Sequence, residues 1–188
     1  MFETLDNITV NELWKLEDES LFISYLELQK VLKPSATFCG FQAKPLGQLE
    51  FGQVANLKEY ISKPTPEGIL DAFKIVFGVK EKAYFAAPVV SYFYALNWIT
   101  EEMRNLVELE GRMLADKPDP LMEMAGAKVL EMFKELPVLD MIAQRYSQPP
   151  QVVETWTYNF IFGLLLMIKK TAEVRENYDR LKKIANPK

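Results

Sequence analysis

The sequence predicts an all-α fold, a compact bundle of about seven to eight helices in one domain. Three observations lead to this prediction. Apolar residues recur every three or four positions along most of the chain. Proline and glycine interrupt these runs at short intervals, and cap residues such as Thr65 stand directly before a proline. The 188 residues, 49% of them hydrophobic, are enough to bury one substantial core.

The first helix is expected from about Val10 to Leu32. Thr9 and Glu12 have the spacing of a capping box, in which each side chain bonds the other residue's backbone N–H. Pro34 ends the run, because proline disfavours helical geometry in the residue before it. A helical arm over residues 1–33 is the alternative to a single domain over residues 1–188.

An irregular segment is expected near residues 34–50, where Gly40, Pro45 and Gly47 break the helical pattern. Two β-compatible pieces, ATFCGF and QLEF, allow one small hairpin there. Two short helices follow, over GQVANLKEYI and over EGILDAFKIVF. The second ends at Gly78, which suits the left-handed conformation of helix ends, and VKEKAY then forms a charged turn.

The segment from Ala87 to about Leu114 is predicted to be the central helix. Its first half is apolar nearly all round, which is typical of a buried helix, and its second half is acidic and amphipathic. Pro120 then starts a helix over LMEMAGAKVLEMFKEL, and Pro137 starts a shorter one over VLDMIAQRY. The last helix is expected to begin at QVVETWTY and to continue to about Ile184.

The composition excludes several classes of active site. The sequence has no histidine, which removes Ser-His-Asp and Cys-His nucleophiles and every His-containing zinc or iron site. Cys39 is the only cysteine, so no intramolecular disulfide can form, and its apolar neighbours predict a small core residue. No glycine-rich phosphate loop and no period of 20 to 50 residues occurs. We therefore expect no catalytic residue, no cofactor and no metal.

Four glutamates of the central segment, Glu101, Glu102, Glu108 and Glu110, suggest a carboxylate metal site. Sites of that type in helical bundles also need a Glu-x-x-His motif, which this sequence cannot supply. A solvated acidic face is the favoured interpretation. A small helical enzyme that uses Asp, Glu, Lys or Tyr for proton transfer stays open as a second alternative function.

The charge pattern argues against nucleic acid as a partner, because the net charge is −4. Acidic residues predominate near the N-terminus, whereas Lys and Arg predominate from Lys169 to Lys188. Opposite ends of this kind favour head-to-tail association, so a homo-oligomer is one partner class. Ordinary helix ends that complement the helix dipole are the simpler interpretation.

The apolar run from Tyr158 to Ile168 is the strongest functional signal. It is about half as long as the roughly 20 residues that span a bilayer, so we expect no membrane partner. The run is wider than one narrow stripe, and the eight methionines of the chain suit adaptable apolar contacts. Packing in the protein's own core and docking of a partner both remain open. The predicted partner-binding residues are Trp156, Tyr158, Phe160, Ile161, Leu164, Leu165 and Met167.

Packing patterns in the sequence resemble those of a protein family. LGQLEFGQVANLKEYI, the FKIVFG helix after it and LDMIAQRYSQPPQVVETWTYNFIFGLLL resemble morphogenesis proteins of tailed bacteriophages, most of all tail-assembly chaperones. The C-terminal part of the match contains Ala143 and Tyr146, a proline turn, and Val153 with Glu154 before an aromatic helix.

The resemblance implies a non-enzymatic protein that coats the apolar, helical tape-measure protein before the tail tube forms. A structural virion component, such as a head-to-tail adaptor or connector ring protein, is the alternative. The implied partners are other phage structural or assembly proteins, in the host cytoplasm or in the virion. The family has no active-site residues to transfer to this chain.

Overall fold

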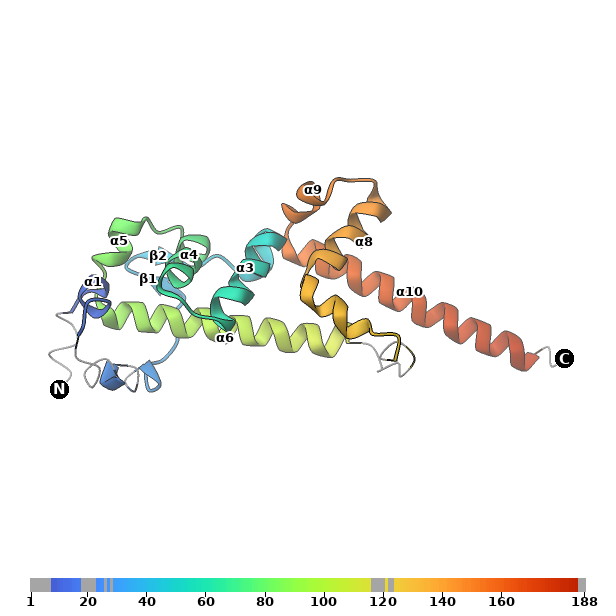
Figure 1. Ribbon diagram of the computed structural model, residues 1–188, viewed down its shortest axis with the longest axis horizontal. Coiled ribbons are helices and arrows are strands. Elements are labelled where there is room, and N and C mark those ends of the chain that lie inside the picture. Colours follow the sequence, from blue (N-terminus) through green and yellow to red (C-terminus); the bar gives the residue numbers. More distant parts are fainter. Residues whose placement is uncertain are drawn as a thin grey trace. The chain divides into compact units, whose positions relative to one another are not determined.

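The computed structural model describes residues 8–17, 23–25, 27, 29–115, 121 and 124–185, without the side chains of residues 128 and 131. This part of the chain is predominantly α-helical, which confirms the predicted fold class. The α-helices are α1 (Val10–Leu13), α3 (Phe51–Ser62), α4 (Pro66–Phe77), α5 (Glu81–Phe85), α6 (Val89–Leu114), α8 (Leu136–Tyr146), α9 (Pro150–Glu154) and α10 (Tyr158–Ala185) (Figure 1). Two 3-10 helices, η2 (Leu46–Gln48) and η3 (Ala127–Phe133), and two strands, β1 (Thr37–Phe38) and β2 (Phe41–Gln42), are the other elements whose bounds lie within the described residues.

The chain divides into two compact units, whereas the sequence predicts one domain. Unit 1 is Met1–Leu49 with Gln53–Val107, and unit 2 is Glu50–Gly52 with Glu108–Lys188. The chain passes between the units just before α3, inside α3 and inside α6. Among the described N-terminal residues, Val10, Leu13 and Tyr25 are buried in unit 1.

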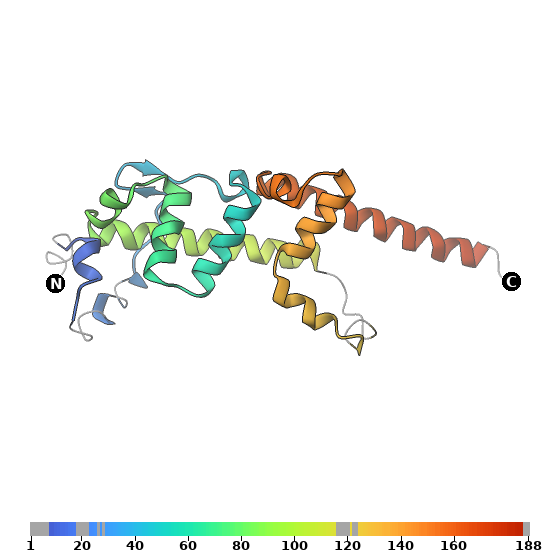
Figure 2. The same cartoon turned by 45° about the horizontal axis from the view of Figure 1, so that its top comes forward.

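Aromatic rings fill the core of unit 1. Phe73 on α4 packs edge-on against Phe38 on β1, with ring centroids 4.8 Å apart, and stacks on Tyr92 on α6 at 5.4 Å. Every residue of α6 from 89 to 99 is buried or half-buried. The first half of α6 is therefore the buried helix that the sequence predicts, with α4, α5 and the hairpin packed along it (Figure 2).

Local capping works as the sequence predicts. The Thr65 hydroxyl accepts the Gly68 N–H at 3.0 Å, and Gly78 ends α4 with φ 66°. Thr9 and Glu12 form the predicted capping box, with the Thr9 N–H donating to the Glu12 carboxylate at 2.8 Å. These ends are set by neighbours in the sequence, so they were predictable without the fold.

The predicted continuous helix from Val10 to Leu32 is wrong. α1 ends at Leu13, and Leu16 and Glu17 are not helical, although residues 23–25, 27 and 29 are. The start of this segment is tied to the start of α6, where the Val89 N–H donates to the Ile8 carbonyl at 2.9 Å.

The other end of the same segment is tied to α6 only about two turns further on. There the Asn97 amide group donates to the carbonyls of Gln29 and Leu32 at 2.8 and 2.9 Å. Residues 89 and 97 are about 12 Å apart along a helix, whereas a straight helix from Val10 to Leu32 is about 33 Å long. The helix must therefore break for both ends to reach α6.

Three further expectations need correction. VKEKAY contains the short helix α5 where a charged turn was expected. The segment LMEMAGAKVLEMFKEL contains the 3-10 helix η3, preceded by Gly126 with φ 84°, while the predicted start at Pro120 lies outside the described residues. The last predicted helix is interrupted after Glu154, because an antiparallel bridge between Glu50 and Thr157 separates α9 from α10.

Cys39 is exposed, and so it is not the small core residue that the sequence predicts. It forms the two-residue loop of the hairpin together with Gly40, with φ 47° and 86°. Loops of this kind need positive φ at both central positions. The predicted small hairpin is therefore confirmed, and it places the cysteine on the surface, where partial desolvation raises the pKa of its thiol.

Each unit contains the same three-helix backbone motif. The motif consists of α4, α5 and the start of α6 in unit 1, and of α8, α9 and the start of α10 in unit 2 (Figure 1). α4 ends at Gly78 with φ 66°, and α8 ends at Ser147 with φ 52°. Two residues later, the extended residues Lys80 and Pro149 are the N-caps of the two five-residue helices α5 and α9.

An isolated antiparallel β-bridge closes each copy of the motif. Thr9 pairs with Pro88 in unit 1, and Glu50 pairs with Thr157 in unit 2. Beside the bridge, the Val10 N–H donates to the Ala87 carbonyl at 2.9 Å in unit 1, and the Phe51 N–H donates to the Trp156 carbonyl at 2.8 Å in unit 2. The two copies of the motif are further apart in the sequence than the roughly 20 to 50 residues of solenoid repeats. Equivalent core positions also hold different residues, such as Phe73 in unit 1 and Ile142 in unit 2. The backbone therefore shows a repeat that the sequence pattern does not.

Candidate protein-binding site

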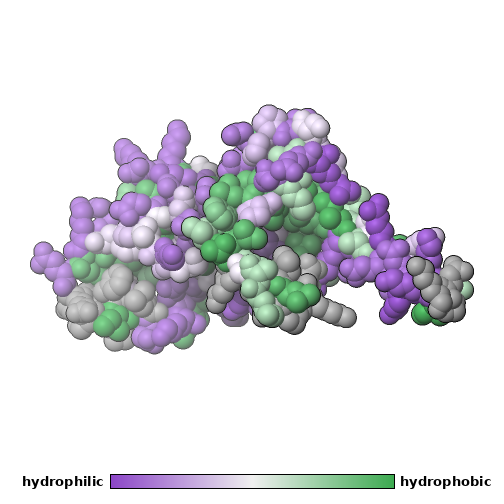
Figure 3. Space-filling view, turned by 45° about the vertical axis from the view of Figure 1, so that its right-hand side comes forward, coloured by the Kyte–Doolittle hydropathy of each residue, from purple (hydrophilic) through white to green (hydrophobic). Residues whose placement is uncertain are grey.

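Exposed hydrophobic side chains are concentrated in unit 2 (Figure 3). Among the described residues, all of the large exposed ones except Ile23, Val31, Phe41 and Val107 belong to this unit. Its buried hydrophobic residues are far fewer than those of unit 1: Phe51, Leu139, Ile142, Ala143, Val153, Tyr158 and Ile161. A unit that exposes more large hydrophobic side chains than it buries is typical of a protein with an interaction site.

One face of α10 supplies part of the core of unit 2. Tyr158 and Ile161 are 3% and 0% exposed, and the Tyr158 ring stacks on Phe51 with centroids 6.3 Å apart. The Tyr158 hydroxyl donates to the Glu110 carboxylate at 2.7 Å. Burial, and then the nearby Glu110 carboxylate, raise the pKa of Tyr158, so the phenol remains a hydrogen-bond donor. Glu110 thus has a structural partner and is not part of a purely solvated acidic face.

Two of the predicted partner-binding residues are therefore core residues. Tyr158 and Ile161 lie three positions apart on the inner face of α10, and neither is available at the surface. The outward part of the predicted set consists of Phe160 and Met167, which are 51% and 47% exposed.

The remaining predicted residues, Trp156, Leu164 and Leu165, are half-buried. The Trp156 ring contacts Phe160 edge-on at 5.3 Å and Tyr146 at 6.0 Å. Trp156 therefore joins α8 to the exposed side of α10. Trp156 precedes α10, and the other predicted residues lie on more than one face of this helix, so the set does not form one patch.

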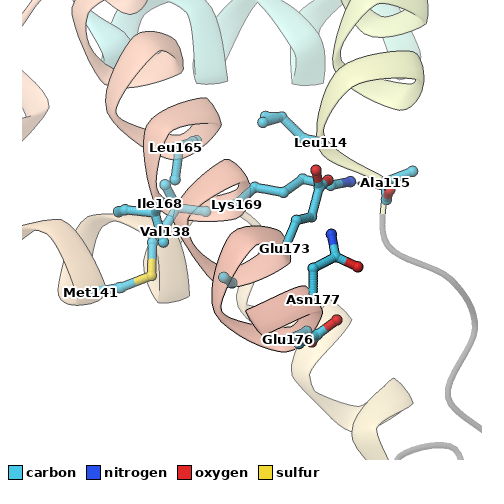
Figure 4. Close-up of a pocket in the computed structure, with 11 residues that line it drawn as sticks. Leu114, Ala115, Val138, Met141, Leu165, Ile168, Lys169, Glu173, Glu176 and Asn177 are labelled. Atoms are coloured by element: carbon cyan, nitrogen blue, oxygen red, sulfur yellow. Dashed lines mark hydrogen bonds between the residues drawn. The ribbon is translucent and has the colours of Figure 1, made fainter. Parts of the chain in front are cut away.

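A groove of about 900 Å³ lies between the end of α6, α8 and α10 (Figure 4). Its apolar lining consists of Leu114, Val138, Met141, Leu165, Ile168 and Ala172. Lys169, Glu173, Glu176 and Asn177 line its polar side, and the Lys169 ammonium donates to the Ala115 carbonyl. An apolar floor with a polar edge suits one face of an amphipathic segment.

A second apolar stripe, which we call the outer seam, runs along α10. It consists of Phe160, Leu164, Met167, Thr171, Val174, Tyr178, Leu181 and Ala185, each three or four residues after the one before. Val174, Tyr178 and Leu181 are 67%, 62% and 60% exposed. The predicted set ends at Met167, although the regular heptad spacing to Ala185 is a signal that could have extended it.

The copy of the motif in unit 1 shows how this chain covers the corresponding part of α6. The backbone N–H of Ser35 donates to the Tyr94 carbonyl at 3.0 Å, and the Asn97 side chain holds residues 29 and 32 as described above. This N-terminal segment therefore lies along α6.

The equivalent region of α10 has no such cover from the described residues. Ser91 and Trp98 on α6 are half-buried, whereas the equivalent residues on α10, Phe160 and Met167, are 51% and 47% exposed. This face of the motif's last helix is thus covered by the N-terminal segment in unit 1, the closed copy, and exposed in unit 2, the open copy.

Metal binding finds no support in the described residues, which contain no cluster of three or more His, Cys, Asp or Glu able to hold an ion. None of the helices that the structure describes is both long and apolar enough to cross a membrane. Comparisons with protein-family models, curated protein sequences and solved structures each return no match for this chain.

Proposed function

We propose that this protein is a non-enzymatic assembly protein that binds an apolar helical segment of a partner polypeptide, in the manner of a phage tail-assembly chaperone. The observation that carries this proposal is the excess of exposed over buried hydrophobic side chains in unit 2. The resemblance of the sequence to phage morphogenesis proteins supports the tape-measure protein as the partner, met in the host cytoplasm during assembly.

The energetics favour an extended contact over a small pocket. Each fully buried hydrophobic side chain contributes roughly 1.5 to 3 kcal/mol, and association costs about 4 to 15 kcal/mol. Several side chains must therefore be buried together for stable binding. The groove and the outer seam provide that number on the two sides of α10.

Co-expression with the tape-measure protein tests the proposal. We expect a soluble complex of defined stoichiometry in size-exclusion chromatography with light scattering, under conditions in which the tape-measure protein alone is insoluble. Met141→Asp, in the groove, should reduce the yield of the complex. Phe41→Asp is the matched control, because Phe41 is exposed to the same extent, 39%, but lies in unit 1.

The proposal fails if no complex forms, or if Met141→Asp and Phe41→Asp have equal effects while circular dichroism shows both variants folded. Mass spectrometry of purified virions then addresses the alternative role. A stoichiometric amount of this chain in the particle would identify a structural component such as an adaptor. Its absence from the particle is the result expected of a chaperone.

A further inference from the structure

We propose that the outer seam of α10 binds an acid-flanked α-helix of the partner by coiled-coil pairing. This inference rests on the proposed function and specifies both the surface and the kind of helix that it takes. The seam geometry, its exposure and the charges beside it carry the inference.

The seam has the period of a coiled coil. Its residues alternate in steps of three and four from Leu164 to Ala185, which is the a/d pattern of a left-handed coiled coil. From Phe160 to Ala185 the helix is about 38 Å long, which accommodates more than three heptads of a partner. A pattern sustained over that length is specific for helix pairing.

The seam is a second apolar face, in addition to the one that α10 uses in its own unit. At 3.6 residues per turn, the seam lies on the side of α10 opposite Tyr158 and Leu165, which belong to the core and the groove. A helix that only packs on its own domain needs one apolar face. The second one is exposed over its last turns, where Val174, Tyr178 and Leu181 are each at least 60% exposed.

One polar seam residue is compatible with burial. The Thr171 hydroxyl donates to the Met167 carbonyl within α10 at 2.8 Å. Its hydrogen atom therefore has an acceptor even when water is removed, and burying Thr171 against a partner leaves no unsatisfied donor.

The charges beside the seam select the partner. Ile168, Arg175 and Lys182 flank it on one side, and Lys170, Asn177 and Ile184 flank it on the other. The acidic residues of α10, Glu173, Glu176 and Asp179, lie on the remaining surface, with Glu173 paired to Lys170 at 2.8 Å. Flanking positions set the choice of partner in coiled coils, so basic flanks favour a helix with Glu or Asp at its own flanking positions.

The same charges disfavour a second copy of α10. A parallel pair of seams would place Lys170 of one chain beside Arg175 of the other, and an antiparallel pair would bring the flank with Arg175 and Lys182 against the same flank of the other chain. Like charges in these positions destabilise the pair. The structure therefore favours a different polypeptide as the occupant.

Two designed peptides test the inference on the full chain. Both are four-heptad helices with Leu at positions a and d, one with Glu and the other with Lys at positions e and g. We expect the Glu peptide to bind at least tenfold more tightly than the Lys peptide in isothermal titration calorimetry, and to bind more weakly at high salt.

Variants locate the binding on the seam. Leu181→Asp should weaken binding of the Glu peptide at least tenfold, whereas Lys183→Asn, which makes the same change in net charge off the seam, should leave it unchanged. The double variant Arg175→Glu with Lys182→Glu should reverse the preference between the peptides. A misfolded variant would lose both peptides, so this reversal depends on the seam itself.

Two results would overturn the inference: equal affinity for both peptides, or a preference that the charge reversal leaves unchanged. Self-association of the chain that Leu181→Asp abolishes would show a second copy as the occupant and would also overturn it. The proposed function is judged separately. It survives if the tape-measure complex forms with the wild-type chain and persists with Leu181→Asp, and in that case only the seam inference fails.

Discussion

The two faces of α10 can be distinguished by one pair of substitutions, Ile161→Ala and Met167→Ala. Ile161 is 0% exposed in the core of unit 2, and Met167 is 47% exposed on the outer seam. Removing a fully buried isoleucine side chain costs about 2 to 5 kcal/mol, because the lost burial is followed by a cavity. Truncating an exposed side chain changes stability by no more than about 0.5 kcal/mol.

The size of the expected shift follows from these values. With a urea dependence of about 2 kcal/mol per molar, a loss of about 3 kcal/mol lowers the midpoint of unfolding by about 1.5 M. The midpoint of Met167→Ala should stay close to that of the wild type. Alanine is also the best helix former, so neither substitution weakens α10 through helix propensity.

The assay must report on unit 2, because two units can unfold separately. Trp156 lies in unit 2, whereas Trp14 and Trp98 lie in unit 1. In a background with Trp14→Phe and Trp98→Phe, urea titration followed by tryptophan fluorescence therefore measures unit 2. Equal losses for the two alanine variants would refute the assignment of the faces, since the outer seam would then be part of the core.

Three other changes have expected outcomes. Gly78→Ala should lower the midpoint of thermal unfolding through about 1 to 2 kcal/mol of backbone strain, because φ is 66° and the new methyl group meets no atom within 4 Å. Ser147→Gly, at φ 52°, should raise the midpoint. Shifts of the same sign for both substitutions would contradict the equivalence of the two motif ends. Tyr158→Phe should cost about 1.5 to 3 kcal/mol in urea unfolding by removing the hydrogen bond to Glu110, and an unchanged midpoint would show that this bond contributes nothing. Burial raises the pKa of Tyr84 from 10.0 to about 12, so the contribution of the neutral phenol to stability is complete below pH 10 and is lost as the pH rises from 10 to 12. Tyr84→Phe should remove this part of the loss of stability at alkaline pH, measured by urea titrations at several pH values.

The repeated three-helix motif bears on how the site arose in the fold. In unit 1 the N-terminal segment lies against α6 through Asn97, and in unit 2 the equivalent position on α10 is Leu166, which has no amide group to hold a passing backbone. The open copy thus lacks the polar anchor of the closed one. Apolar pairing along the outer seam is the contact that remains available to it.

Helix ends determined by neighbouring residues were predictable from the sequence. Thr65, Pro66 and Gly78 define α4, and the prediction for this helix is confirmed at both ends. The helix breaks that the sequence did not predict depend on residues that are distant in the chain. α9 and α10 separate where Glu50 pairs with Thr157, and the first predicted helix breaks because both of its ends are bonded to α6. Local pattern contains no information about such pairings.

The candidate site was predictable in its location along the chain but not in its orientation. The apolar run from Tyr158 to Ile168 marked the start of α10, and heptad spacing could have extended the site to Ala185. Periodicity identifies the faces of a helix without saying which one its own domain covers. Tyr158 and Ile161 were therefore assigned to the partner surface together with Phe160, which lies on another face.

The sequence by itself determined the helical class of this protein and excluded histidine and paired-cysteine chemistry, because these properties depend on composition and local spacing. Tertiary structure alone decided that the chain forms two units, that Cys39 lies in a hairpin loop, and which face of α10 is open. The physical reason is that burial depends on what packs against a residue. For Tyr158 those neighbours are Phe51 and Glu110, which are far away in the chain.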